Sequence, residues 1–210
     1  MHVLVADEHT IARKGLRDLL IQHYSGVTVS ECTSIRRTAA TLASRTTDLV
    51  ILDLLLSDGN AFDHLASWHA GHASTRFLIY SVLPEHLFAQ RVVALGCSGF
   101  LPKAASEEEL LSAVDHVMSG GIHMRHAPVT GGRSKLPFES TASPFTRLSD
   151  RELRVLQELL AGTSIKDIAR QLLLSPSTVA TYKARVYDKL GVANEMELRR
   201  AAEINGFRFP

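Results

Sequence analysis

Charged and polar side chains with the potential for chemistry follow four apolar runs in the first half of the sequence. Asp7 and Glu8 follow the first of these runs, Asp53 the second, Ser81 the third and Lys103 the last. Short apolar runs are typical of strands buried in a parallel sheet. Because chemistry in open α/β sheets takes place beyond the carboxyl ends of the strands, we expect these five side chains to converge at one edge.

Three carboxylates at one edge repel one another and raise a pKa unless a cation lies between them. Mg²⁺ suits such a site, since it prefers carboxylate oxygens, keeps several waters and commonly bridges to a phosphate. A carboxylate such as Asp53 can also act as a nucleophile toward phosphorus and form an aspartyl-phosphate. Lys103 and Mg²⁺ would then offset the charge on the phosphoryl group, and Ser81 could donate a hydrogen bond to it.

The elements that must position these residues follow a regular alternation over residues 1–120. Apolar runs predict strands at residues 3–6, 27–29, 48–53, 77–81 and 99–103. Helical spacing and helix-start or helix-stop residues predict helices at residues 10–24, 34–45, 61–69, 85–95 and from 106 to the Gly120-Gly121 pair, with a turn at Gly59-Asn60. Five strands alternating with five helices predict an α/β fold, a flavodoxin-like doubly wound five-stranded parallel sheet.

The second half of the sequence changes character twice. Residues 121–147 hold a Gly pair, three prolines and a Ser/Thr cluster without any period, which predicts a flexible linker. Residues 148–210 then carry capping residues at Ser149, Ser164, Ser175 and Asn194, each before a helical stretch. We therefore expect a small all-α domain of four helices with helix-turn-helix geometry.

Composition sets broad limits on the protein. It has 210 residues, 45% of them hydrophobic, and a net charge of +1, which suits two modest globular domains. Residues 1–120 carry 9 Lys/Arg and 13 Asp/Glu, whereas residues 146–210 carry 11 and 8, so an acidic front precedes a basic back. We expect no signal peptide, no membrane association, and a cytoplasmic location with Cys32 and Cys97 reduced and no structural zinc.

The four strand-end clusters of residues 1–120 resemble the receiver domain of two-component response regulators. By that resemblance Asp53 is the phosphoacceptor, and Lys103 and Ser81 assist it. Mg²⁺ would be held by Asp7, Glu8, Asp53 and the backbone carbonyl of Leu55, while Ser81 and Phe100 would be the switch hydroxyl and the switch aromatic. The sequence departs from the family at four positions: Glu8 replaces an Asp, and Leu56, Ser57 and Ala61 replace Met, Pro and Gly. His9 is expected to be a solvated or capping residue.

Residues 146–208 resemble the LuxR-type helix-turn-helix, on the segments Leu148-Ser149-Asp150-Arg151-Glu152, Leu174-Ser175, Thr178-Val179 and Lys189-Leu190-Gly191-Val192 among others. We expect the helix from Ser175 to bury Val179, Val186 and Leu190 and to leave a polar side that suits the major groove. The expected DNA contacts are Lys166, Ser177, Thr178, Ala180, Thr181, Tyr182, Lys183, Arg185 and Lys189. Ala180 stands where a lysine is common in the family.

Both resemblances together are those of a NarL/FixJ-type response regulator. The function that they imply is phosphorylation-controlled transcription regulation rather than an enzyme activity. A sensor histidine kinase or phosphotransfer domain would supply the phosphoryl group, and phosphorylation would favour a homodimer that binds double-stranded DNA.

Three alternatives belong beside this interpretation. The first is a regulator that binds DNA independently of phosphorylation and has a vestigial receiver. The second is a phosphohydrolase using Asp53 covalently, but haloacid-dehalogenase-type enzymes need a second Asp two residues later, where this sequence has Leu55. The third is a flavin-binding flavodoxin, but Asp7-Glu8 would repel the phosphate that such a protein binds.

Overall fold

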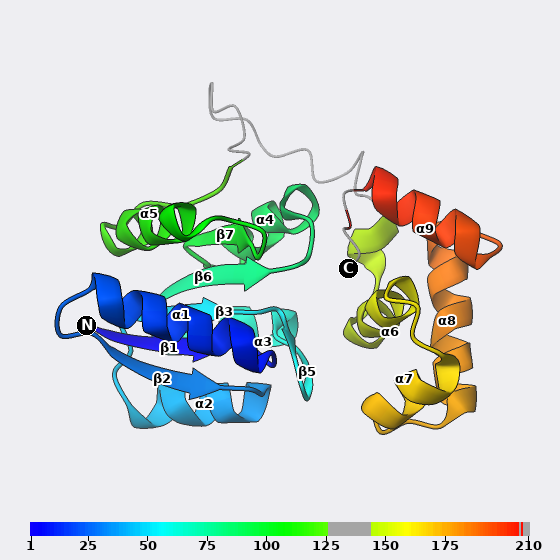
Figure 1. Ribbon diagram of the computed structural model, residues 1–210, viewed down its shortest axis with the longest axis horizontal. Coiled ribbons are helices and arrows are strands. Elements are labelled where there is room, and N and C mark those ends of the chain that lie inside the picture. Colours follow the sequence, from blue (N-terminus) through cyan, green and yellow to red (C-terminus); the bar gives the residue numbers. More distant parts are fainter. Residues whose placement is uncertain (126–143, 206, 208–210) are drawn as a thin grey trace. The chain divides into compact units, whose positions relative to one another are not determined.

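The computed structural model of the protein describes residues 1–125, 144–205 and 207 (Figure 1). The chain divides into two compact units, Met1–Gly131 and Gly132–Pro210, and each is described by itself. The dividing point and most of the linker expected at residues 121–147 lie outside the described residues. Among the residues that are described, no helix combines the length and the apolarity needed to cross a membrane.

The first unit is built on a parallel sheet of five strands in the order β2-β1-β3-β6-β7. The strands are β1 (His2–Ala6), β2 (Thr28–Cys32), β3 (Leu49–Leu52), β6 (Arg76–Ser81) and β7 (Gly99–Pro102). The central strands β1 and β3 are fully buried, as expected for a sheet covered on both faces. This arrangement confirms the predicted flavodoxin-like doubly wound sheet.

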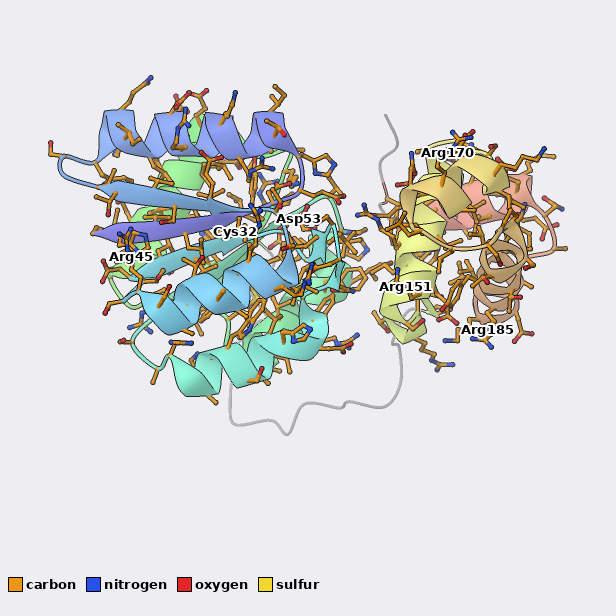
Figure 2. All side chains as sticks on the ribbon, turned by 90° about the horizontal axis from the view of Figure 1, so that it is seen from below. Cys32, Arg45, Asp53, Arg151, Arg170 and Arg185 are labelled. Atoms are coloured by element: carbon orange, nitrogen blue, oxygen red, sulfur yellow. The ribbon has the colours of Figure 1, made fainter. Side chains whose placement is uncertain are left out.

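Five helices cover the two faces of this sheet. They are α1 (Thr10–His23), α2 (Ile35–Ser44), α3 (Phe62–Gly71), α4 (Glu85–Ala94) and α5 (Glu107–Met118). Helices α1 and α5 share one core with alternate residues of the strands, such as Val3, Val5 and Ile51. Figure 2 shows α2 and α3 on the side of the sheet opposite α1. Successive side chains of each strand point to opposite faces of the sheet and so fill two cores, one on each face. The ends of the strands are left for polar side chains.

The second strand and the loop after the third differ from the expectation. The predicted strand at residues 27–29 is wrong in extent, since β2 continues to Cys32 in register with β1. Being an edge strand, it is only partly buried and tolerates polar residues that hide its pattern. The predicted turn at Gly59-Asn60 is one strand of a small antiparallel pair, β4 (Leu55–Leu56) with β5 (Gly59–Asn60). Strands of two residues are too short to show an alternating apolar pattern in the sequence.

The chain after α5 does not leave the sheet at once, contrary to the linker expected from residue 121. His123 bridges to Gly99 in parallel fashion, and its carbonyl accepts the Phe100 N–H at 2.9 Å. A Cβ on Gly99 would lie 2.4 Å from the His123 carbonyl, so this close approach requires glycine. The Arg125 N–H donates to Glu85 at 2.5 Å, which ties the segment to the start of α4.

The second unit is all-helical in its described part. A 3-10 turn (Pro144–Arg147) precedes α6 (Asp150–Leu160), α7 (Ile165–Gln171), α8 (Pro176–Leu190) and α9 (Glu195–Ile204). Ser164, Ser175 and Asn194 accept the expected N-cap hydrogen bonds from the first turns of their helices. The predicted four-helix domain is confirmed, and it begins within the stretch expected to be linker, because Phe145 of the 3-10 turn is buried.

Candidate functional site

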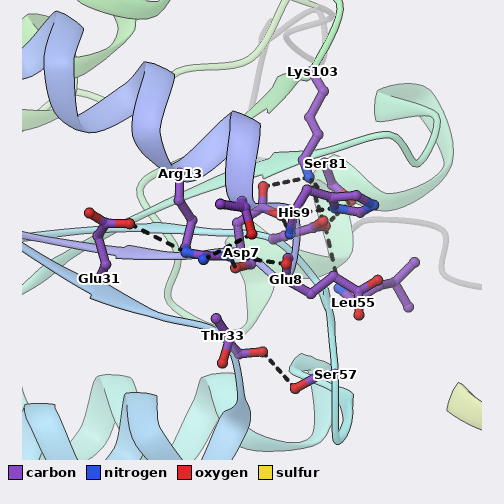
Figure 3. A network of polar contacts seen from close by, with 12 residues as sticks. Asp7, Glu8, His9, Arg13, Glu31, Thr33, Leu55, Ser57, Ser81 and Lys103 are labelled. Carbon is purple, nitrogen blue, oxygen red and sulfur yellow. Dashed lines mark hydrogen bonds and ion pairs between the residues drawn. The ribbon is translucent and has the colours of Figure 1, made fainter.

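Three strand ends bring a carboxylate, an ammonium and a hydroxyl into direct contact at one edge of the sheet (Figure 3). Asp53, which follows β3, is buried and accepts a hydrogen bond from Ser81 Oγ at 2.8 Å through Oδ1. Its other oxygen, Oδ2, lies 2.7 Å from Lys103 Nζ. Asp7, which follows β1, lies 2.5 Å from the same Nζ through its own Oδ2. One lysine therefore bridges two buried carboxylates that are far apart in sequence and offsets part of their charge.

Burial and neighbouring charges shift the pKa values of this pocket in opposite directions, and which effect is larger differs among Asp53, Asp7 and Lys103. Burial raises the pKa of Asp53, although the Lys103 ammonium acts in the opposite direction. Burial also acts to raise the pKa of Asp7, but the hydrogen bond from His9 and the charge of Lys103 outweigh it, so that pKa lies below its usual value. For Lys103, burial acts to lower the pKa, and Asp53 and Asp7 together raise it above the usual value. Lys103 is therefore held in its charged form.

His9 lies in the same pocket, which the sequence did not suggest. It occupies the N-cap position of α1, but its side chain caps nothing there, so the capping expectation is wrong. Instead its ring Nδ1 lies 2.9 Å from Asp7 Oδ1 and 3.4 Å from Lys103 Nζ. Hydrogen bonding to Asp7 raises the pKa of His9. The His9 side chain is 60% exposed, so the expectation that it is solvated agrees with the structure.

The pocket brings together three groups that could hold a cation. Asp7, His9 and Asp53 each place one ligand atom within 4.8 Å of the others, and Glu8 is not part of this group. Carboxylate oxygens dominate the donor set, and Mg²⁺ prefers oxygen. An ammonium already bridges the Asp7 and Asp53 oxygens, which marks the point between them as favourable for positive charge. The donor set therefore fits Mg²⁺, although not with the complete ligand set expected.

The remaining residues expected in this pocket occupy supporting positions. The Leu55 N–H donates to Asp53 Oδ1 at 3.3 Å, so this backbone contacts the carboxylate directly. Phe100 is fully buried on β7, and its backbone is held by the segment after α5. The loop that departs from the family pattern is folded rather than open, because Ser57 Oγ donates to the Thr33 carbonyl at 2.8 Å and Leu56 is buried.

Helix α8 presents a polar face in the second unit. Val179 and Val186 are fully buried, which fixes the rotation of the helix, whereas Leu190, expected to be buried, is only partly so at the end of the helix. The opposite side leaves Ser177, Ala180, Thr181 and Arg185 exposed, with Thr178, Tyr182 and Lys183 partly so. Ser175 caps the helix and Pro176 occupies its first turn, so the amino-terminal end is rigidly defined. Short polar side chains at that end and cations further along suit base edges and phosphates respectively.

The cations of α8 have different partners within the domain. Arg185 lies over the ring of Tyr182 at 5.9 Å and Lys183 over that of Tyr187 at 5.3 Å. Lys189, in contrast, forms an ion pair with the buried Glu152 at 2.6 Å. Its ammonium holds α8 to α6, whereas Arg185 lies at the periphery of the helix in Figure 2.

Helix α7 contributes one further cation of the predicted set. Lys166 is exposed near the start of this helix. Leu173, in the turn that joins α7 to α8, has a φ of 54° and is 92% exposed. That backbone conformation is strained for a leucine, and it allows the Leu174 N–H to donate to the Ala169 carbonyl at 2.8 Å and close the end of α7.

Comparisons with known proteins match both units. Residues 3–115 match the response regulator receiver domain, and residues 146–202 match the luxR family of bacterial regulatory proteins. The chain is 27% identical over 207 residues to the response regulator UvrY of Escherichia coli, covering 98% of this chain and 95% of that protein. It is 31% identical over 196 residues to the transcriptional regulatory protein UhpA of Salmonella typhimurium, covering 93% and 94%.

A solved structure has the same fold over almost the whole length. RcsB from Salmonella enterica serovar Typhimurium, bound to promoter rprA in the presence of the phosphomimetic BeF3-, aligns with a TM-score of 0.60 at 22% identity. The alignment covers 97% of this chain and 98% of that one. The two matched domains and the near-complete coverage of full-length relatives show that this chain belongs to the two-component response regulators of the NarL/FixJ type, with a receiver domain and a LuxR-type DNA-binding domain.

Proposed function

We propose that Asp53 accepts a phosphoryl group from a sensor histidine kinase or a phosphotransfer domain, and that this controls DNA binding by the second unit. The observation that carries the proposal is the pairing of the buried Asp53 carboxylate with Lys103 on one oxygen and Ser81 on the other. A carboxylate oxygen would attack the phosphorus of a phosphohistidine, so a P–O bond forms and the P–N bond breaks, and the leaving imidazole retains the electron pair.

Asp7 and Asp53 would hold Mg²⁺, and Mg²⁺ would supply positive charge to the phosphoryl oxygens. Lys103 already lies beside both carboxylates, so its ammonium would be close enough to stabilise the negative charge that the phosphoryl group adds. Ser81, fully buried and hydrogen-bonded to Asp53, would transfer its hydrogen bond to the phosphoryl group. Phe100 is its proposed switch partner. Glu8, next to Asp7, and the Leu55 carbonyl remain proposed ligands by family resemblance.

The second unit supplies the proposed output. We propose residues 1–120 as the receiver, residues 148–210 as the DNA-binding domain and residues 121–147 as the linker between them, whose first residues pack on the receiver and whose last residues pack on the helical domain. The RcsB structure bound to a promoter and that of two RcsB dimers on two parallel DNAs support double-stranded DNA and a homodimer as partners. A DNA-binding regulator of this kind would act in the cytoplasm.

The polar face of α8 allows each proposed DNA contact to be tested by substitution. Ser177, Ala180 and Thr181 would face base edges, with Lys183 beside them, while Thr178, Tyr182, Arg185 and Lys166 would contact phosphates. Because the Lys189 ammonium is paired with Glu152, we give it a structural role in place of the predicted phosphate contact. Arg185→Met should reduce the slope of log affinity against log salt by about 1, and Lys189→Met should leave that slope unchanged.

The test of the proposed function is direct. The protein is incubated with acetyl phosphate and Mg²⁺, and its intact mass is measured beside that of Asp53→Asn. One added phosphoryl group on the wild type and none on the variant supports the proposal, and dimerisation and DNA affinity are then compared between the two forms. No addition to a folded wild-type protein, from acetyl phosphate or from a histidine phosphotransfer protein, would instead favour a regulator that is independent of phosphorylation.

A further inference from the structure

Arg13 is a buried cation beside the acidic pocket, and its hydrogen bonds there go to backbone carbonyls (Figure 3). It lies on α1 with its side chain 11% exposed. Its Nη1 donates to two consecutive backbone carbonyls, those of Asp7 at 2.8 Å and Glu8 at 3.0 Å. Its Nε lies 3.4 Å from Glu31 of β2, which offsets the buried charge. The guanidinium therefore holds the loop between β1 and α1 through its backbone carbonyls.

The second of these carbonyls connects Arg13 to the pocket through a single rigid unit. The Glu8 carbonyl and the His9 N–H belong to the same peptide group, which is planar. That His9 N–H donates to Asp7 Oδ1 at 2.8 Å. A donor that fixes the carbonyl side of this peptide also fixes the direction of its N–H, and so the orientation of the Asp7 carboxylate. Asp7 in turn places its other oxygen against Lys103.

We propose that Arg13 is a positioning residue for the acidic pocket: by pinning the Glu8–His9 peptide it aims the Asp7 carboxylate toward Asp53 and sets the affinity of the pocket for Mg²⁺. The inference rests on the proposed function in so far as that function requires Mg²⁺. Groups that orient the ligands of a metal from behind typically contribute roughly 10- to 100-fold to metal affinity. The guanidinium is needed because Nη1 donates to both carbonyls while Nε stays beside Glu31, and a single ammonium does not serve both places at once.

Arg17 provides a matched comparison on the same helix. It also forms an ion pair with Glu31, at 3.1 Å, and it pairs with Asp18, so its guanidinium is bound to side-chain carboxylates and not to the loop between β1 and α1. Arg17→Met therefore removes an α1 cation from the same acidic partner without freeing the peptide. His9→Ala is a second comparison, because it deletes the ring contact to Asp7 and keeps the backbone N–H.

The experiment measures the Mg²⁺ dissociation constant of the full-length chain by isothermal titration calorimetry at fixed pH. Arg13→Met should weaken Mg²⁺ binding by roughly 10-fold or more. Arg13→Lys should recover part of that loss, and Arg17→Met should bind as the wild type does. His9→Ala should change the constant less than Arg13→Met. Fluorescence of Trp68, the single tryptophan, which is buried in the first unit, reports whether each variant is folded before titration.

A purely structural role for Arg13 predicts a different pattern. Arg13→Met would then lower the urea midpoint for unfolding in the absence of Mg²⁺ while the folded variant kept the wild-type dissociation constant, and that result would overturn the inference. If Arg13→Met does not fold, the comparison rests on Arg13→Lys, whose Mg²⁺ binding should lie measurably below the wild type. A wild-type chain that fails to bind Mg²⁺ would overturn the inference together with the Mg²⁺ part of the proposed function, whereas the phosphoryl-acceptance assay tests Asp53 separately.

Discussion

Removing the Lys103 ammonium should strongly destabilise the first unit, and Mg²⁺ should recover part of the loss. Lys103→Met leaves Asp7 and Asp53, both almost fully buried, without the cation that lies 2.5 and 2.7 Å from their oxygens. Removal of one partner from a buried ion pair costs about 3–5 kcal/mol, because the remaining charge is uncompensated. With an overall stability of about 5–15 kcal/mol, this is a large fraction of what holds the fold.

The expected loss of stability depends on pH, because a carboxylate left without Lys103 can bind a proton and become neutral. Each pKa unit by which a folded carboxyl must rise costs about 1.36 kcal/mol at a pH where the unfolded group is ionised. Burial already raises the pKa of Asp53 with the lysine present, and removing the lysine raises it further. The destabilisation should therefore be largest near pH 8 and shrink as the pH falls toward 5.

The assay is urea unfolding followed by fluorescence of Trp68, which lies in α3 and so reports on the first unit alone. A loss of 3–5 kcal/mol lowers the urea midpoint by about 2 M for an ordinary slope. Lys14→Met, at an exposed position on α1, is the matched control and should change little. Millimolar Mg²⁺ should raise the midpoint of Lys103→Met more than that of the wild type, since the metal supplies the missing charge.

A double-mutant cycle with Asp53→Asn isolates the interaction. Lys103→Met should cost less in the Asp53→Asn background, because one of the two buried charges is already absent, and the coupling should be at least about 1 kcal/mol. Strictly additive effects of Lys103→Met and Asp53→Asn would refute the reasoning that the two groups stabilise one another across the pocket.

Three further expectations concern other parts of the chain. Leu173→Asn should stabilise the second unit by about 1 kcal/mol, since Asn tolerates the left-handed backbone; Leu173→Ala, which keeps the strain, is the control, and equal unfolding temperatures for the two variants would contradict the account. Burial acts to raise the pKa of Glu152, but Lys189 outweighs it and the pKa is lowered. The stabilisation from this pair is therefore present above the ordinary Glu pKa and disappears as the pH falls through the lowered value; in calorimetry Lys189→Met should lower the unfolding temperature of the second unit at pH 7, and this effect should shrink as the pH falls below the ordinary Glu pKa. Glu85→Ala should free the segment that follows α5 and speed hydrogen exchange at the Phe100 amide by roughly tenfold, with no change at the Leu78 amide.

Local patterns were enough to find most elements and the central residues of the pocket. Apolar runs marked the buried strands, and the capping serines at positions 106, 164 and 175 marked the helix starts, because both signals depend on residues within a few positions of each other. Once the sheet is parallel and doubly wound, its strand ends meet at one edge. The contact of Asp53 with Lys103 and Ser81 follows from that topology.

Other features have no local signal. The β4–β5 pair spans only two residues on each side, and the edge strand β2 reaches Cys32 through polar residues because one side of it faces solvent. His9 is an ordinary histidine at a helix start until the fold brings Lys103 beside it. Arg13 could have been an outward-facing cation of α1, and only the backbone path of the preceding loop places two carbonyls within its reach.

The two lysines of α8 separate what the sequence determines from what only the tertiary structure decides. In sequence, Lys183 and Lys189 are equivalent cations on the polar side of one helix. Glu152, 37 residues earlier than Lys189, caps α6 through the Ser149 N–H and is buried where the carboxyl end of α8 crosses it. A buried carboxylate must be paired, so the packing of two helices decides that Lys189, and not Lys183, is engaged with Glu152 inside the domain. The sequence by itself determined the elements and the chemistry at the strand ends, while the tertiary structure decided which charges neutralise each other.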